Sequence, residues 1–224
     1  MDLINISETL KIYWPVPLLA LVITFAGNTW IDYLYPQALQ RNSLSFQEQI
    51  PQRAKWRKPF LFISLFFCFA KAWSFLSMPA LFYILAAISL LLFITVTDFE
   101  QQVILNEMVL LFSITGVFYI LHLQLPVKDH LTAFWGGGSL FLFLSFLSKG
   151  AIGGGDIKLI ASLGLWLGWK TLLSVIIYGA MAAGVAALIL LITQRITRKQ
   201  YLAYGPYFAL SGIGMMLTWL KVFL

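Results

Sequence analysis

The 224-residue sequence contains a single cysteine, Cys68, which lies inside a long apolar run. One cysteine excludes an intrachain disulfide, a zinc site built from several cysteines and a dithiol redox pair. Charged residues are also scarce, at 11% of the sequence, whereas soluble domains contain about a quarter. Because 60% of the residues are hydrophobic, a water-soluble fold of this length could not bury so much apolar surface. The composition therefore predicts a membrane protein.

Long apolar runs follow one another along the whole chain. A helix of about 20 residues crosses the hydrocarbon core of a bilayer, and on this basis the runs predict an all-α, polytopic membrane protein of about eight transmembrane helices. The predicted spans cover residues 13–35, 59–76, 78–97, 103–124, 130–148, 156–170, 171–193 and 202–223. We expect one membrane domain, 1–224, which includes a short basic loop at 36–58.

The positive charges are distributed unevenly between the two sides of this arrangement. Ten lie on one side: Arg41, Arg53, Lys55, Arg57, Lys58, Lys149, Lys158, Arg195, Arg198 and Lys199. The other side has five: Lys11, Lys71, Lys128, Lys170 and Lys221. Loops rich in Lys and Arg stay in the cytoplasm, so the first side is predicted to be cytoplasmic. The net charge of +6 is therefore attributed to loops that set the orientation of the protein in membrane lipid. No nucleic acid partner is expected.

Two of the nine acidic residues have no simple solvated explanation. Asp98 ends the apolar run LLFITVTD, and Asp156 follows three glycines at the start of another run. Two predicted spans lie between them, and two crossings return the chain to the side it left. The two aspartates are therefore expected on the same cytoplasmic face. Asp98 could instead be an anchor at a helix end, and the three glycines before Asp156 could simply form a flexible turn.

Two carboxyl groups in a poorly hydrated pocket cannot both ionise easily, so they are expected to share a proton and act as acid and base. Glycines before Asp156 would allow close approach of another segment. An aspartate at a helix start caps free N–H groups, which would hold its carboxylate in a fixed direction. The pair is suited to hydrolysis of a peptide bond by water, without a metal or cofactor.

Three motifs resemble the type IV prepilin peptidases, membrane-embedded aspartyl proteases of the GxGD type. The run GGGDIKL at 153–159, continued by ASLGLWLG at 161–168, matches the GxGDxKL segment of that family. The run DFEQQVILN at 98–106 resembles its first aspartate segment, although Leu105 replaces the usual proline. The run YGPYFAL at 204–210 resembles its GPF stretch. By resemblance, Asp98 and Asp156 are the catalytic pair.

The resemblance implies an endopeptidase of the bacterial inner membrane, with its active site toward the cytoplasm. Such enzymes remove the leader peptide of type IV prepilins or type II secretion pseudopilins. Many also methylate the new N-terminus with S-adenosylmethionine, which would be the only cofactor here if that activity is retained. Many relatives carry a zinc domain with two CxxC pairs in the first cytoplasmic loop. This chain has no cysteine there, so it resembles a short form.

Several other residues are expected near the pair, and some of them allow two interpretations. Gly153 and Gly155 are expected to shape the site. Lys158 could orient a substrate carboxylate or anchor the helix at the membrane surface, and Asn106 could contact the site or cap a helix. The pair Gly205-Pro206 could form a substrate-facing break or simply begin the last helix.

Two further acidic residues near the pair, Glu100 and Glu107, are expected to be solvated or interfacial. A different function is also compatible with the sequence, because intramembrane carboxylates beside glycine-broken helices serve in transporters and channels as ion-coupling groups.

Overall fold

The computed structural model describes residues 13–42, 54–74, 78–149, 152–194 and 203–223. This part of the chain is almost entirely helical, and no strand occurs in these ranges. Its helices are α2 (Pro15–Asn42), α4 (Arg57–Trp73), α5 (Met78–Gln101), α6 (Asn106–His122), α7 (Val127–Leu147), α8 (Gly154–Ile192) and α9 (Gly205–Phe223). The predicted all-α membrane fold is confirmed. Helices suit a bilayer because each satisfies its own backbone hydrogen bonds.

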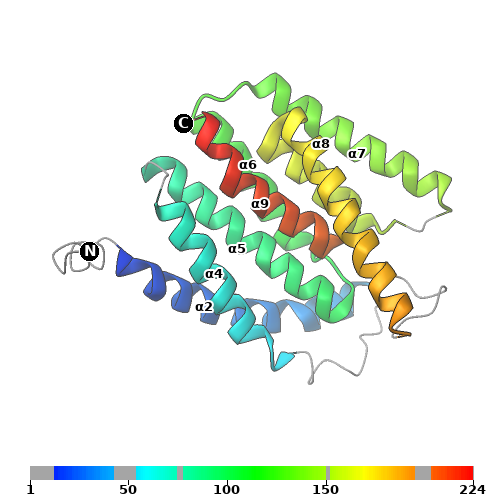
Figure 1. Cartoon of the computed structure of the whole chain (residues 1–224), viewed down its shortest axis with the longest axis horizontal. Coiled ribbons are helices and arrows are strands. Elements are labelled where there is room, and N and C mark those ends of the chain that lie inside the picture. The colour runs from blue at the N-terminus through cyan, green and yellow to red at the C-terminus, as the bar shows by residue number, and fades with distance from the viewer. Residues whose placement is uncertain (1–12, 43–53, 75–77, 150–151, 195–202, 224) are drawn as a thin grey trace.

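Helix α5 forms the centre of the bundle. It lies between α4 and α9 in Figure 1 and also packs against α6 and α2. In its most apolar stretch, 83% of the residues are buried inside the protein, compared with 22% for α7. A helix that is hydrophobic all round belongs in the interior of a bundle. Asp98, in the last turn of this helix, is accordingly buried.

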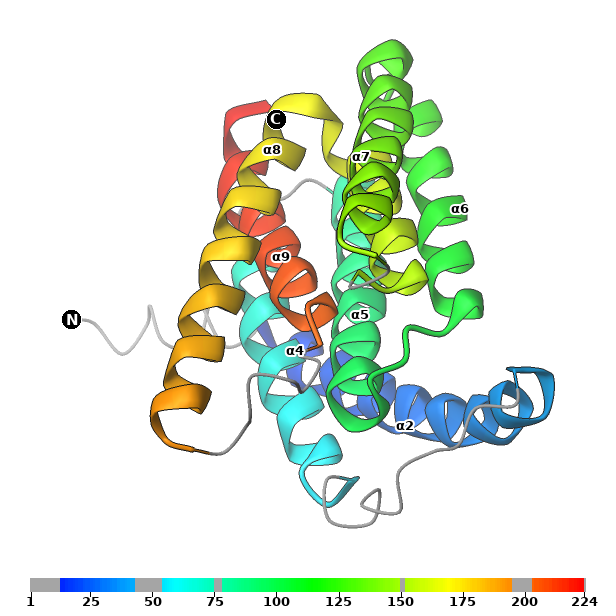
Figure 2. The ribbon, with the colours of Figure 1, turned by 90° about the vertical axis from the view of Figure 1, so that its right-hand side faces the viewer.

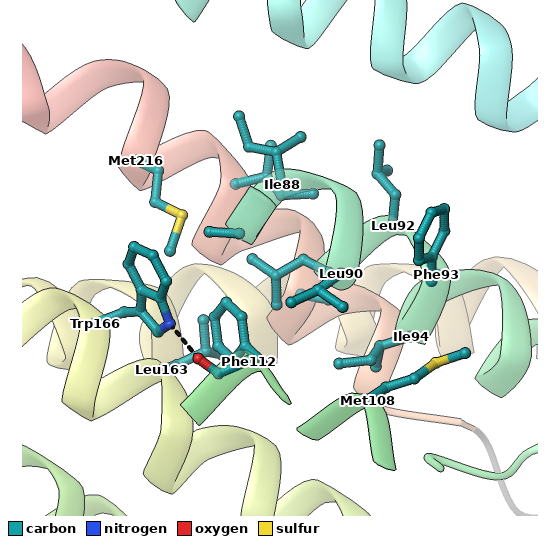
Figure 3. Packing of buried hydrophobic residues seen from close by; sticks show 14 of the residues in the cluster. Ile88, Leu90, Leu92, Phe93, Ile94, Met108, Phe112, Leu163, Trp166 and Met216 are labelled. Carbon is teal, nitrogen blue, oxygen red and sulfur yellow. Dashed lines mark hydrogen bonds between the residues drawn. The ribbon is translucent and has the colours of Figure 1, made fainter. Parts of the chain in front are cut away.

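The core around α5 combines residues of α5, α6, α8 and α9, some of which are drawn in Figure 3. In this view Leu90 of α5 lies near Phe112 of α6, and Ile94 of α5 lies near Met108 of α6. The indole N–H of Trp166 donates a hydrogen bond to the backbone oxygen of Phe112 at 2.7 Å, which joins α8 to α6. Helix α6 thus packs against both α5 and α8.

Helix α8 reverses direction at Gly168 (Figure 2). The backbone angles of Gly168 are φ 70° and ψ 175°, a region that is essentially restricted to glycine. A methyl group added at Gly164 would lie only 3.0 Å from Leu172 Cδ2, which is possible because the chain folds back. The predicted spans 156–170 and 171–193 are thus the two arms of one bent element.

Gly168→Ala is expected to destabilise the protein by about 1–3 kcal/mol, the usual cost of a residue forced into a disfavoured backbone conformation. The added methyl group would also collide with Asp129 Oδ2, whose carboxylate accepts a hydrogen bond from the Trp169 backbone N–H at 3.2 Å. The measurement is the midpoint of thermal unfolding in detergent. Gly184→Ala, in the second arm of α8, is the control, because a methyl group there meets nothing within 4 Å. Equal midpoints for the two variants would contradict the reversal.

Among the described residues, four helical segments are long and apolar enough to cross a membrane: Pro15–Ala38, Pro79–Gln101, Val127–Leu147 and Gly154–Ile192. Helix α6 is apolar but shorter. The chain is a multi-pass membrane protein, and the count of eight spans stays a prediction. All eight predicted spans map onto helices, with two of them joined in α8.

The predicted loop 36–58 differs in part from the structure. Its first seven residues continue α2 to Asn42, with Pro36 inside the helix. Proline removes one backbone hydrogen bond, while Tyr35 and Ala38 on either side of it are buried, and this packing favours continuation of the helix. The stretch 43–53 lies outside the described residues.

Candidate active site

Asp98 and Asp156 come together from two different helices. Asp98 lies in the last turn of α5 and is 5% exposed, and Asp156 lies in the first turn of α8 and is 9% exposed. Their carboxyl groups are close enough for the charge of Asp156 to act on Asp98. The structure therefore brings two residues that are 58 positions apart in the sequence into one buried region. We call this region, around Asp98 and Asp156, the pocket.

The start of α8 explains how the Asp156 side chain is held. Gly153 is the N-cap of the helix, so Asp156 stands at its third position. From there its carboxylate accepts a hydrogen bond from the Gly153 backbone N–H, as acidic side chains at this position commonly do. This local bond orients the carboxyl group before any tertiary contact is considered.

The start of α9 closes the other side of the pocket. The backbone N–H of Gly205 is directed at the Asp98 carboxylate as a donor. A methyl group at Gly205 would collide with Asp98 Oδ2 and would lie 2.9 Å from Ile104 Cδ1. Gly205 is thus required for close approach of α9 to the aspartate. Pro206 is buried in the first turn of α9, where a proline ring is tolerated.

Ile104, in the short connection between α5 and α6, packs against both glycine segments. A methyl group at Gly155 would lie 2.8 Å from Ile104 Cβ, while the opposite end of the Ile104 side chain reaches Gly205. Sequence reasoning missed this residue. The available signal was its position inside the run 98–106, between the first aspartate and Asn106.

The pocket contains polar atoms without partners. Within the described residues, buried side-chain atoms that lack a hydrogen bond occur on Asp98, Asp156 and Gln101. Gln101 lies three positions after Asp98, so the two share one face of α5. Such atoms are rare in folded proteins, and each one calls for a functional or structural reason. Their concentration at one end of α5 marks this pocket as the candidate active site.

Two of the predicted site residues, Lys158 and Asn106, lie beside this pocket but line a separate groove. Lys158 Nζ donates a hydrogen bond to Asn106 Oδ1 at 2.8 Å, at an exposed position. Both line an apolar groove of about 760 Å³ between α6, α7 and α8, which neither aspartate lines. The structure therefore brings Gly153, Gly155 and Gly205 to the aspartates, and turns Lys158 and Asn106 toward the groove.

The expectation that Glu100 is solvated or interfacial is wrong. Its side chain is buried and forms an ion pair with Arg57, the first residue of α4. Arg57 was counted among loop charges, yet it is also buried. Charged side chains enter the interior when each has a partner, and this partner is 43 positions away, beyond the reach of local sequence patterns.

Glu107, the other acidic residue near the pair, lines the apolar groove.

Comparison with known proteins gives a consistent result. The profile of the Type IV leader peptidase family matches residues 85–188. Three similar curated proteins are all named "Prepilin leader peptidase/N-methyltransferase". The protein from Pectobacterium carotovorum is 32% identical over 151 residues, which are 62% of this chain and 52% of the relative.

The Bacillus subtilis protein is 30% identical over 129 residues, which are 56% of this chain and 51% of the relative. The Dickeya chrysanthemi protein is 39% identical over 69 residues, or 30% of this chain and 24% of the relative. The chain spans about half the length, or less, of these curated relatives. No solved structure matches it. The matched segment includes both aspartates, Ile104 and the glycines before Asp156, and over this segment the chain is similar to the type IV leader peptidase family.

Proposed function

We propose that this protein is an aspartic endopeptidase of the bacterial inner membrane that removes the leader peptide of type IV prepilins or type II secretion pseudopilins. The observation that carries the proposal is that Asp98 and Asp156 are both buried and lie close enough to interact. The relatives named as prepilin leader peptidases support the choice of substrate. The excess of Lys and Arg on one side of the predicted spans supports an active site toward the cytoplasm.

The chemistry needs only the two carboxyl groups and water. One ionised aspartate takes a proton from water as the water oxygen attacks the carbonyl carbon of the scissile peptide bond. The protonated aspartate donates a hydrogen bond to the developing oxyanion. The carbon–nitrogen bond then breaks, and the leaving amine takes up a proton from the pair. Because the two carboxyl groups form one coupled unit, the proton belongs to the pair.

Methylation of the new N-terminus with S-adenosylmethionine stays a prediction. The groove between α6, α7 and α8 is lined by apolar side chains and by polar ones that include Asn106, Glu107 and Lys158, and no residue there is tied to S-adenosylmethionine by a specific contact. We therefore assign no residue to methyl transfer, and the proteolytic steps proceed without it.

The test is the mass of a purified prepilin after incubation with the purified enzyme in detergent, with and without S-adenosylmethionine. We expect loss of the leader peptide in both reactions, and a gain of one methyl group only if methyl transfer is retained. An unchanged mass for every prepilin and pseudopilin tested would refute the proposal. Proton-coupled solute uptake into liposomes, in the absence of cleavage, would favour a transporter instead.

A further inference from the structure

The end of α5 carries a second buried charged group, on the side that faces away from Asp98. Glu100 and Arg57 are each only 3% exposed. Arg57 Nε donates to Glu100 Oε1 at 2.8 Å, and Arg57 Nη2 donates to Glu100 Oε2 at 2.6 Å. A two-point contact of this kind fixes both the distance and the orientation of the two side chains.

Helix α2 completes the group around this ion pair. The Tyr35 hydroxyl donates a hydrogen bond to Glu100 Oε2 at 2.8 Å, and the Arg57 guanidinium lies 5.6 Å from the centre of the Tyr35 ring. Arg57 Nη1 also donates a hydrogen bond to Asp32 Oδ1. The other carboxylate oxygen of Asp32 accepts a hydrogen bond from Asn28 Nδ2, one turn earlier in α2. Three helices, α2, α4 and α5, are thus joined at one point. We call Tyr35, Arg57 and Glu100, with Asp32, the α5 anchor.

The position of the anchor on α5 links it to the candidate active site. Successive residues of an α-helix are separated by about 100°, so Glu100 and Asp98 point to nearly opposite sides of α5. The helix ends directly afterwards: Gln102 has a φ of 55°, and its backbone N–H donates a hydrogen bond to the backbone carbonyl oxygen of Asp98 at 2.8 Å. Last turns of helices fray readily. This last turn must stay formed if Asp98 is to face Asp156.

We propose that Arg57 and Glu100 are positioning residues, which hold the last turn of α5 so that the Asp98 carboxyl group faces Asp156 and Gly205. A buried ion pair contributes little net stability compared with apolar packing, and its best-supported use is to specify one arrangement. Arg57, Tyr35 and Asp32 all precede the segment that matches the family profile. The N-terminal helices therefore take part in building the site.

The first test needs no substrate. Cys68, the only cysteine of the chain, is changed to Ala, and the pair Asp98→Cys and Gly205→Cys is introduced. Because these positions are in contact, an added oxidant should form a disulfide between them. Adding Arg57→Gln or Glu100→Gln is expected to slow disulfide formation about tenfold, a typical size for coupling between adjacent networks.

Leu65→Ala is the matched control for this test. Leu65 is fully buried in the same helix as Arg57, and its truncation destabilises the fold without touching the α5 anchor. It should leave the rate of disulfide formation unchanged. Equal rates with and without the anchor substitutions, or no disulfide in the parent pair, would overturn the inference.

The second test rests on the proposed function and uses enzyme with native aspartates. Arg57→Gln and Glu100→Gln should each lower kcat about tenfold to a hundredfold, because a displaced catalytic group has large effects on rate, with little change in KM. Arg57→Lys, which keeps the charge, should recover part of kcat. If the wild type cleaves prepilin and Arg57→Gln has normal kcat, the inference fails alone. If no prepilin is cleaved but disulfide formation depends on the anchor, the proposed function fails alone.

Discussion

Asp98→Asn and Asp156→Asn are each expected to stop cleavage of a prepilin while leaving the folded protein intact. General acid–base groups contribute about 10²- to 10⁴-fold to rate, and an amide can neither accept the proton of water nor share one with its partner. The measurement is the single-turnover rate of leader removal by purified enzyme. The two substitutions together should cost little more than either alone, since residues that act as a unit are not additive.

Stability should respond in the opposite direction from activity. Each carboxyl group has a buried oxygen without a partner, so its replacement by a neutral amide removes the penalty of a buried charge. Thermal midpoints of both variants should equal or exceed that of the wild type. Asp129→Asn, which makes the same chemical change near Gly168, is the control and should retain cleavage. Normal processing by either Asp98→Asn or Asp156→Asn would end the proposal of an aspartic dyad.

Gly155→Ala and Gly205→Ala are expected to have the second largest effects. A methyl group at Gly205 would collide with the Asp98 carboxylate, and one at Gly155 would lie 2.8 Å from Ile104 Cβ. Overpacking of this kind costs about 1–3 kcal/mol. Displacement of a catalytic group by as little as about 1 Å can lower the rate roughly a hundredfold. We therefore expect loss of both cleavage activity and thermal stability.

The neighbouring glycine offers a matched control for these two variants. A methyl group at Gly154 would meet nothing within 4 Å, although Gly154 belongs to the same run of three. Gly154→Ala should keep the wild-type rate of cleavage and the wild-type midpoint of unfolding. If all three substitutions behaved alike, the close approach of α8 and α9 to Ile104 and Asp98 would not be what these glycines provide.

Much of the site could be predicted from sequence because the relevant signals are local. Hydropathy locates the helices since each span must be apolar along its own length. The capping position of Asp156 follows from the residues directly before it. Counting two spans between Asp98 and Asp156 places them on one face without knowledge of packing. The three motifs resemble those of the type IV prepilin peptidases, and the comparisons with known proteins support this resemblance.

Contacts between side chains that are distant in the sequence depend on tertiary packing and could not be predicted from local patterns. The partners Arg57 and Glu100 are 43 positions apart, and each looks like an ordinary surface charge in the sequence. Ile104 becomes a contact of Gly155 and Gly205 only when α8 and α9 pack against the end of α5. The helices and the two candidate aspartates could be predicted from the sequence, since these features depend on local composition. The buried ion pair and the closed pocket depend on desolvation and packing, which arise only when separate helices come together.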